Sequence, residues 1–193
     1  EDADLKAELE SRGDDTDNRN IIAINENEKS IVAELLEKIN NTFLITFEFK
    51  IVDEFGIADL VITVAKKAKT VAGPLEKLGK FMHASKGGVV DGDPPIISKS
   101  IIYLFEDTFE DVDTSKHVLL YQMGHFLGLK TPHSGDNTNT TGKLKTTETV
   151  MSWTYDETQT DFTLLDKRAI KEIWEEAMAA YGITRNAPGN NEE

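Results

Sequence analysis

Apolar residues follow two different spacings along the first half of the chain. From residue 27 to residue 43 they recur every three to four positions, which predicts an amphipathic helix with Asn27 as a candidate N-cap. Four later stretches are short and apolar in the manner of strands, some alternating and some continuous. They predict strands at 43–52, 58–65, 79–85 and 100–107.

Two further helical patterns lie in the second half of the chain. The first starts near Thr114 and Ser115 and stops near Gly128. The second covers 164–182, ends at Gly182, and places these apolar residues on one face: Leu165, Ile170, Ile173, Trp174 and Met178. The succession of helix, strands, helix, polar loop and helix predicts an α+β domain, in which a twisted mixed sheet packs on helices.

Composition predicts one domain with two tails. The 193 residues are close to the usual size of a single domain. Residues 1–20 are acidic with few apolar groups, which predicts a flexible segment, and residues 187–193 read as a flexible tail. The folded domain is therefore expected to span 21–186.

Charge and cysteine content exclude several classes of protein. The chain has 35 acidic against 21 basic residues, a net charge of −14, which argues against nucleic acid or an anionic membrane as partner. It has no cysteine, so disulfides, thiolate zinc sites and a Cys nucleophile are ruled out. No apolar run reaches the roughly 18 residues that a membrane span needs. The composition leaves the oligomeric state open.

Candidate chemistry is concentrated in the stretch YQMGHFLGLKT, which covers 121–131. A helical zinc site places two His one turn apart, with a Glu after the first as general base and a third ligand after a Gly turn. Here His125 holds the second His position and Gly128 holds the turn. The first ligand position is Tyr121, a poor zinc ligand, and the base position is Gln122, an amide of negligible basicity.

This stretch resembles the HExxHxxGxxH or HExxHxxGxxD motif of the metzincin zinc metallopeptidases, although the third ligand position is Thr131. Downstream, TVMSW resembles the metzincin Met-turn, and the resemblance implies that Met151 lies beneath the metal site. Where some family members have an extra Tyr ligand, this chain has Trp153. The strand ADLVI and the final helix also resemble those of matrixin-like and serralysin-like members.

The resemblance implies a metzincin-like fold with a degenerate zinc motif, hence a pseudopeptidase without peptide hydrolysis. His125 and His133 remain as candidate metal ligands, but no bound cofactor is expected. Tyr121 and Gln122 are expected to hydrogen-bond to His125 or to each other and to fill the vacated site. An extended peptide or protein is the expected partner, paired with the strand at 100–107 as an added strand.

Two alternatives stay open. One is an active zinc endopeptidase with an atypical site, in which His125, His133 and a carboxylate such as Asp136 or Glu148 hold the metal. The other is a structural or assembly protein that keeps the helix for packing alone. The resemblance and the lack of an initial Met favour a secreted or extracytoplasmic location.

Overall fold

The structure is a computed structural model. The residues that it describes include most of the predicted helices and strands. Residues 1–20 and 187–193, the predicted flexible segments, lie outside the described part. The described residues are 21–22, 24–43, 48–52, 58–65, 79–86, 96–130, 148–152, 158–180 and 182.

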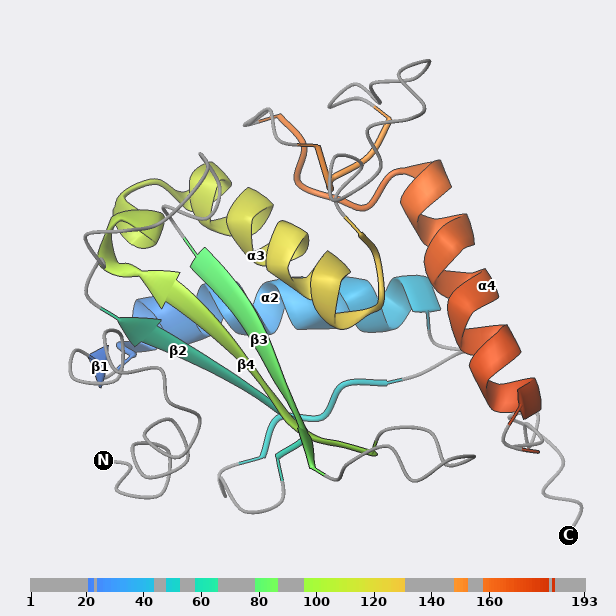
Figure 1. Ribbon diagram of the computed structural model, residues 1–193. Coiled ribbons are helices and arrows are strands. Elements are labelled where there is room, and N and C mark those ends of the chain that lie inside the picture. The colour runs from blue at the N-terminus through green and yellow to red at the C-terminus, as the bar shows by residue number, and fades with distance from the viewer. Residues whose placement is uncertain are drawn as a thin grey trace, which may run out of the picture.

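A mixed sheet and three α-helices make up the described fold (Figure 1). The sheet has the strand order β1-β2-β4-β3; β2 and β4 are parallel, and the outer strands β1 and β3 are antiparallel to their neighbours. The strands are β1 (Ile21–Ile22), β2 (Leu60–Ala65), β3 (Gly79–Lys86) and β4 (Ile96–Phe105). The chain is therefore of mixed α+β class, as the sequence predicts.

Strand β4 lies inside the sheet, so the prediction that 100–107 forms a free edge is wrong. It pairs with β2 on one side and with β3 on the other. Both ladders and both faces are covered, which explains why residues 101–105 are all fully buried. Such a continuous apolar run is typical of an interior strand in a sheet with parallel pairing. Among the described strands, β3 is the long strand that ends the sheet.

Helices α2 (Glu26–Phe43) and α3 (Val112–Phe126) pack against the sheet. Ile102 and Leu104 of β4 lie in one apolar core with the buried faces of both helices. A short 3-10 helix, η3 (Glu106–Glu110), leads from β4 into α3, while α4 (Leu164–Ala180) stands beyond the C-terminal end of α3 (Figure 1). Within the described ranges, no helix is long and apolar enough to cross a membrane.

Helix α2 is capped by Asn25 rather than by Asn27. The Asn25 side chain accepts the backbone N–H of Glu28 at 3.0 Å, and the Glu28 carboxylate accepts the N–H of Asn25 at 2.7 Å. This reciprocal capping box satisfies two backbone donors that the first helical turn leaves open. Asn27 instead lies within the first turn and is exposed.

The predicted strand at 43–52 is wrong where the structure describes it. Phe43 is the last residue of α2, and residues 48–52 form no strand. The Asn40 side chain binds both polar groups of the Phe49 backbone, accepting its N–H at 2.6 Å and donating to its carbonyl at 2.8 Å. Because the Asn40 amide satisfies both the N–H and the carbonyl of Phe49, that residue needs no hydrogen-bonded strand beside it. Residues 44–47 lie outside the described part.

Candidate functional site

The motif helix α3 is fixed at its N-terminal end by side-chain hydrogen bonds. The Asp111 carboxylate accepts the N–H of Thr114 at 2.7 Å, and the hydrogen bonds from Thr114 lower the pKa of Asp111. The Ser115 hydroxyl donates to the carbonyl of Thr108 at 2.8 Å and is fully buried. Further along, Lys116 forms an ion pair with Glu34 of α2 at 2.7 Å. The helix begins about two residues earlier than the sequence predicts.

The C-terminal end of α3 is closed by a turn that requires glycine. Gly128 has φ of 97°, a left-handed conformation that residues with a Cβ rarely adopt. Its N–H donates to the carbonyl of His125 at 3.1 Å, and the N–H of Leu129 donates to the carbonyl of Gly124 at 2.8 Å. This is the Schellman pattern, which satisfies the last helical carbonyls and turns the chain away. The predicted helix end at Gly128 is therefore confirmed.

The first two ligand positions of the motif lie one turn apart, and their rings touch. Tyr121 and His125 have ring centroids 4.8 Å apart and interplanar angle 88°, an edge-to-face contact. Tyr121 is buried at 3% exposure and belongs to the apolar core. Burial lowers the pKa of His125, and a backbone hydrogen bond with Leu129 opposes that change. The first ligand position therefore holds a packed aromatic ring beside a largely neutral imidazole.

Gln122, at the general-base position, is buried at 1% exposure. Its side-chain nitrogen Nε2 has no hydrogen-bond partner among the described residues. An unpaired amide donor costs about 1–3 kcal/mol when it is buried. Tyr121 and Gln122 were predicted to fill the vacated site and to hydrogen-bond to His125 or to each other. Both side chains are buried, and among the described residues Nε2 of Gln122 makes no such bond.

The turn at 148–152 lies against the last turn of α3. A Cβ atom placed on Gly124 would collide with the sulfur of Met151, so the helix and the turn touch at a position where only glycine fits without movement. Met151 is buried at 1% exposure. Leu129, just past the helix end, packs beside the same glycine. The methionine therefore lies directly under the segment that carries the motif.

Asp166 joins this turn to α4. Its carboxylate accepts hydrogen bonds from the Thr149 hydroxyl at 2.6 Å and the Val150 N–H at 3.0 Å. It also accepts the N–H of Thr163 at 3.0 Å and the Thr163 hydroxyl at 2.8 Å, while its own N–H donates to the same hydroxyl at 3.2 Å. Asp166 is buried at 2% exposure. It therefore completes a capping box for α4 and at the same time holds the turn.

Sequence reasoning missed Asp166, although a signal for it exists. Thr163 and Asp166 form the pattern of Thr, two residues and an acid before an apolar run, which predicts a capping box. The pattern predicts the local pair but not the bonds to the turn at 148–152, which depend on how α4 sits. His117, on the same helix as His125, likewise depends on a distant segment. It is buried at 1% exposure, and its Nδ1 lies 3.1 Å from the carbonyl of Gln159.

The described residues of the motif do not fit a catalytic zinc ion, which takes three protein ligands. They offer one imidazole, a buried phenol ring and a buried amide. Within the described ranges, no three His, Asp or Glu side chains gather as a metal-ligand group. Glu148, proposed for the atypical site, is exposed. The other candidates lie outside the described residues: Thr131, His133, Asp136 and Trp153.

A pH dependence follows from His125. Because burial lowers its pKa in the folded state, the unfolded chain binds more protons as the pH falls below about 6.5. Stability is therefore fully present above that pH and decreases as the pH falls toward the folded pKa. We expect His125→Gln to flatten the pH dependence of the free energy of unfolding between about pH 7 and pH 5. Urea unfolding at several pH values would measure it, and an unchanged pH profile in the variant would contradict the assignment.

The described geometry defines an α+β domain in which a glycine-ended helix rests on a methionine turn. Comparison with known proteins adds nothing to that description. No protein-family model matches the chain, and searches of curated proteins and of solved structures also gave no match. The functional argument therefore rests on the residues themselves.

Proposed function

We propose that this chain is a metzincin-like domain that has lost peptide hydrolysis and keeps a peptide-binding role. The observation that carries the proposal is Gln122, fully buried at the base position of a helix that retains His125 and the Gly128 turn. A glutamine in that position cannot take a proton from water, because the amide has negligible basicity. The role left for such a domain is binding.

Three contacts support the family resemblance. Met151 lies against Gly124, in the place that the resemblance gives to the methionine of a Met-turn. Gly128 ends the helix in a left-handed conformation, three residues after His125. Tyr121 and His125 are in edge-to-face contact one turn apart, the spacing of the two helical ligands of the family. These residues thus match the metzincin motif more closely in their arrangement than in their ability to bind a metal.

The same contacts argue against metal-dependent hydrolysis. A phenol is a poor zinc ligand beside imidazole, and the Tyr121 ring is packed in the core. Moving it out to meet a metal would forfeit roughly 1.5–3 kcal/mol of apolar burial. His125 alone gives one firm ligand, while catalytic zinc sites use three from the protein.

The peptide would pair with β3 rather than with β4. In the described sheet β3 pairs with β4 along one side only, so its other side is the place for an added strand. The added strand would gain main-chain hydrogen bonds along Gly79–Lys86. This moves the predicted binding strand by one place in the sheet and keeps the same mode of recognition.

The test combines activity with stability. We expect no cleavage of casein with added zinc, and a melting temperature that zinc or a chelator leaves unchanged. A real site filled at a hundred times its Kd would add about 2.7 kcal/mol, or roughly 5–10 °C. The matched control is His125→Gln, which should behave as the parent in both assays. Turnover that a chelator abolishes, together with stoichiometric zinc, would support the active alternative instead.

Binding is tested on the same protein. A casein-derived peptide is titrated into isotope-labelled protein, and amide resonances are followed by NMR. We expect shifts along β3, Gly79–Lys86, and none at the opposite edge strand, Ile21–Ile22. If no resonance of β3 moves at millimolar peptide, the peptide role is wrong and the structural or assembly alternative is favoured.

A further inference from the structure

A cavity separates α4 from the end of α3. Its volume is about 280 Å³. Its described walls are mainly apolar and come from three segments: the turn after α3, the turn at 148–152, and α4. The apolar lining residues are Leu129, Met151, Leu165, Ala169 and Ile173. Leu165 is 48% and Ile173 38% exposed, so the cavity is reached from solvent on the side of α4.

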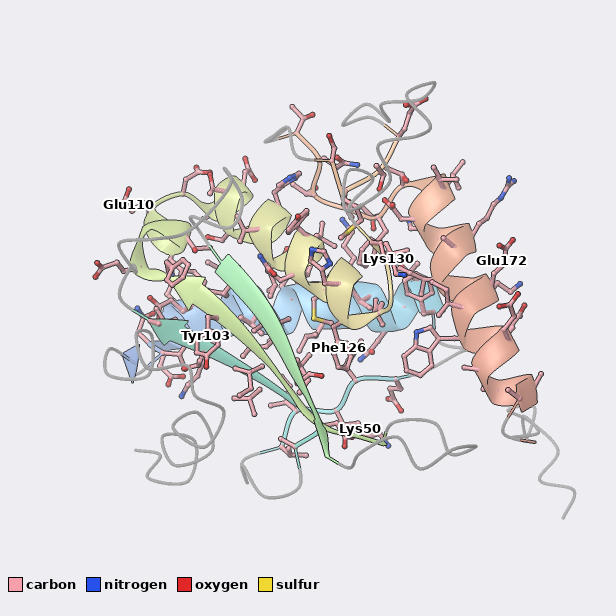
Figure 2. The ribbon with its side chains drawn as sticks, in the orientation of Figure 1. Lys50, Tyr103, Glu110, Phe126, Lys130 and Glu172 are labelled. Atoms are coloured by element: carbon pink, nitrogen blue, oxygen red, sulfur yellow. The ribbon has the colours of Figure 1, made fainter. Side chains whose placement is uncertain are left out.

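The polar groups that line this cavity differ in whether they are already hydrogen-bonded or ion-paired. Asp166 and Thr149 line the wall, but they bind each other at 2.6 Å, and the Asp166 carboxylate accepts three more hydrogen bonds. Lys130 also lines the wall, is exposed, and forms no ion pair with any described residue. Figure 2 shows Lys130 between α3 and α4, whereas Glu172 lies on the outer side of α4. The wall thus presents apolar surface and one cation.

We propose that this cavity binds a small organic anion in which an aromatic or aliphatic group carries a carboxylate. A cavity of about 150 Å³ lined by apolar side chains accepts benzene. The volume here therefore holds a ring with a short chain. The carboxylate of the ligand pairs with Lys130 at the rim. The Thr149 hydroxyl already donates to the Asp166 carboxylate, so neither group binds a further anion. The ring lies on Met151, Ala169 and Ile173.

Charge and packing both favour this occupant over a neutral one. Among the described lining residues Lys130 is the one basic side chain, and it favours an anionic group at this apolar opening although the chain as a whole has net charge −14. Of α4, only Asp166 and Ile170 are buried among the described residues, so a ligand between α4 and the turn adds apolar contact where it is lacking. The inference is independent of the proposed function, because neither Gln122 nor β3 takes part.

The probe is phenylbutyrate, with its neutral amide as the matched control. The chain has 4 methionines, so labelling their methyl groups gives a simple NMR spectrum in which Met151 reports the cavity. We expect phenylbutyrate to shift the Met151 methyl saturably at millimolar concentration, and the amide to bind several-fold more weakly. Lys130→Gln should weaken the carboxylate by roughly two- to five-fold and leave the amide unchanged.

A cavity-filling variant locates the site. Ala169→Phe, or Ala169→Leu if the larger residue prevents folding, should abolish the shift of the Met151 methyl. The proposal is overturned if that methyl shows no saturable shift, if the amide binds as tightly as the carboxylate, or if filling the cavity leaves binding intact. Because this readout does not involve casein or zinc, its failure is distinct from failure of the proposed function.

Discussion

Asp166→Ala is expected to lower the free energy of unfolding by about 4 kcal/mol. The carboxylate is buried and accepts hydrogen bonds from Thr149, Val150 and Thr163. Hydrogen bonds to a charged group contribute about 1.5–3 kcal/mol each, and they are not additive within one network. Removing the acceptor also leaves the Val150 N–H buried without a partner. The melting temperature should fall by roughly 10 °C.

The matched control for this change is Asp161→Ala. Asp161 forms ion pairs with Lys167 at 3.1 Å and with Lys38 at 3.8 Å, but its side chain is 42% exposed. Exposed pairs contribute about 0–1 kcal/mol, so the control should lose little. The loss of stability in Asp166→Asn should lie between the losses in the two Ala variants, because the remaining amide oxygen can still accept hydrogen bonds from Val150 and Thr163. Equal losses in the two Ala variants would show that the buried network does not hold the turn.

How much the sequence could predict depends on whether the signal was local. The glycine end of α3 was predictable, since Gly128 follows the last apolar turn and carries the φ that a Schellman end requires. The helices and three of the strands followed from the spacing of apolar residues. In each case the deciding interactions lie within a few residues of one another.

The errors occurred where distant partners decide. The continuous apolar run at 101–105 is a local sign of an interior strand, but the strands that flank it, β2 and β3, come from distant segments, and 100–107 was expected at the edge. The apolar run at 43–52 was read as a strand, whereas Phe43 completes α2 and Phe49 is held by the Asn40 side chain. Nothing local marks His117 as buried, because the segment that it contacts, at Gln159, is 42 residues away. Burial of this kind follows only from the assembled fold.

The candidate site likewise combines local contacts, which the sequence predicts, with distant contacts, which depend on the fold. The positions of Tyr121, Gln122, His125 and Gly128 relative to each other were fixed by helix periodicity, and the contact between Tyr121 and His125 follows from it. The resemblance implied only that Met151 lies beneath the metal site, and its contact with Gly124, 27 positions earlier in the chain, is seen only in the fold. That contact is also the one whose disturbance should have the clearest consequence.

Gly124→Val is expected to destabilise the fold by about 3 kcal/mol. In a helix interior, glycine is unfavourable by about 0.5–1 kcal/mol relative to Ala, so a helix without further constraint would gain from a Cβ. Here the Cβ would meet the sulfur of Met151, so the buried methionine must shift toward the cavity that it lines and lose part of its packing against the helix. Even Gly124→Ala should therefore fail to stabilise the protein, as measured by urea unfolding.

A double-mutant cycle separates this collision from the difference in helix propensity between glycine and valine. Met151→Ala alone should cost about 2–4 kcal/mol, because it removes a buried side chain and leaves a cavity. Since it also removes the atom that a Cβ at Gly124 would strike, the second substitution should then cost less, with a coupling of about 1–2 kcal/mol. The helix-propensity cost is present in both backgrounds and cancels. Strictly additive losses would mean that the two residues do not touch, and the Met-turn assignment would lose the contact on which it depends.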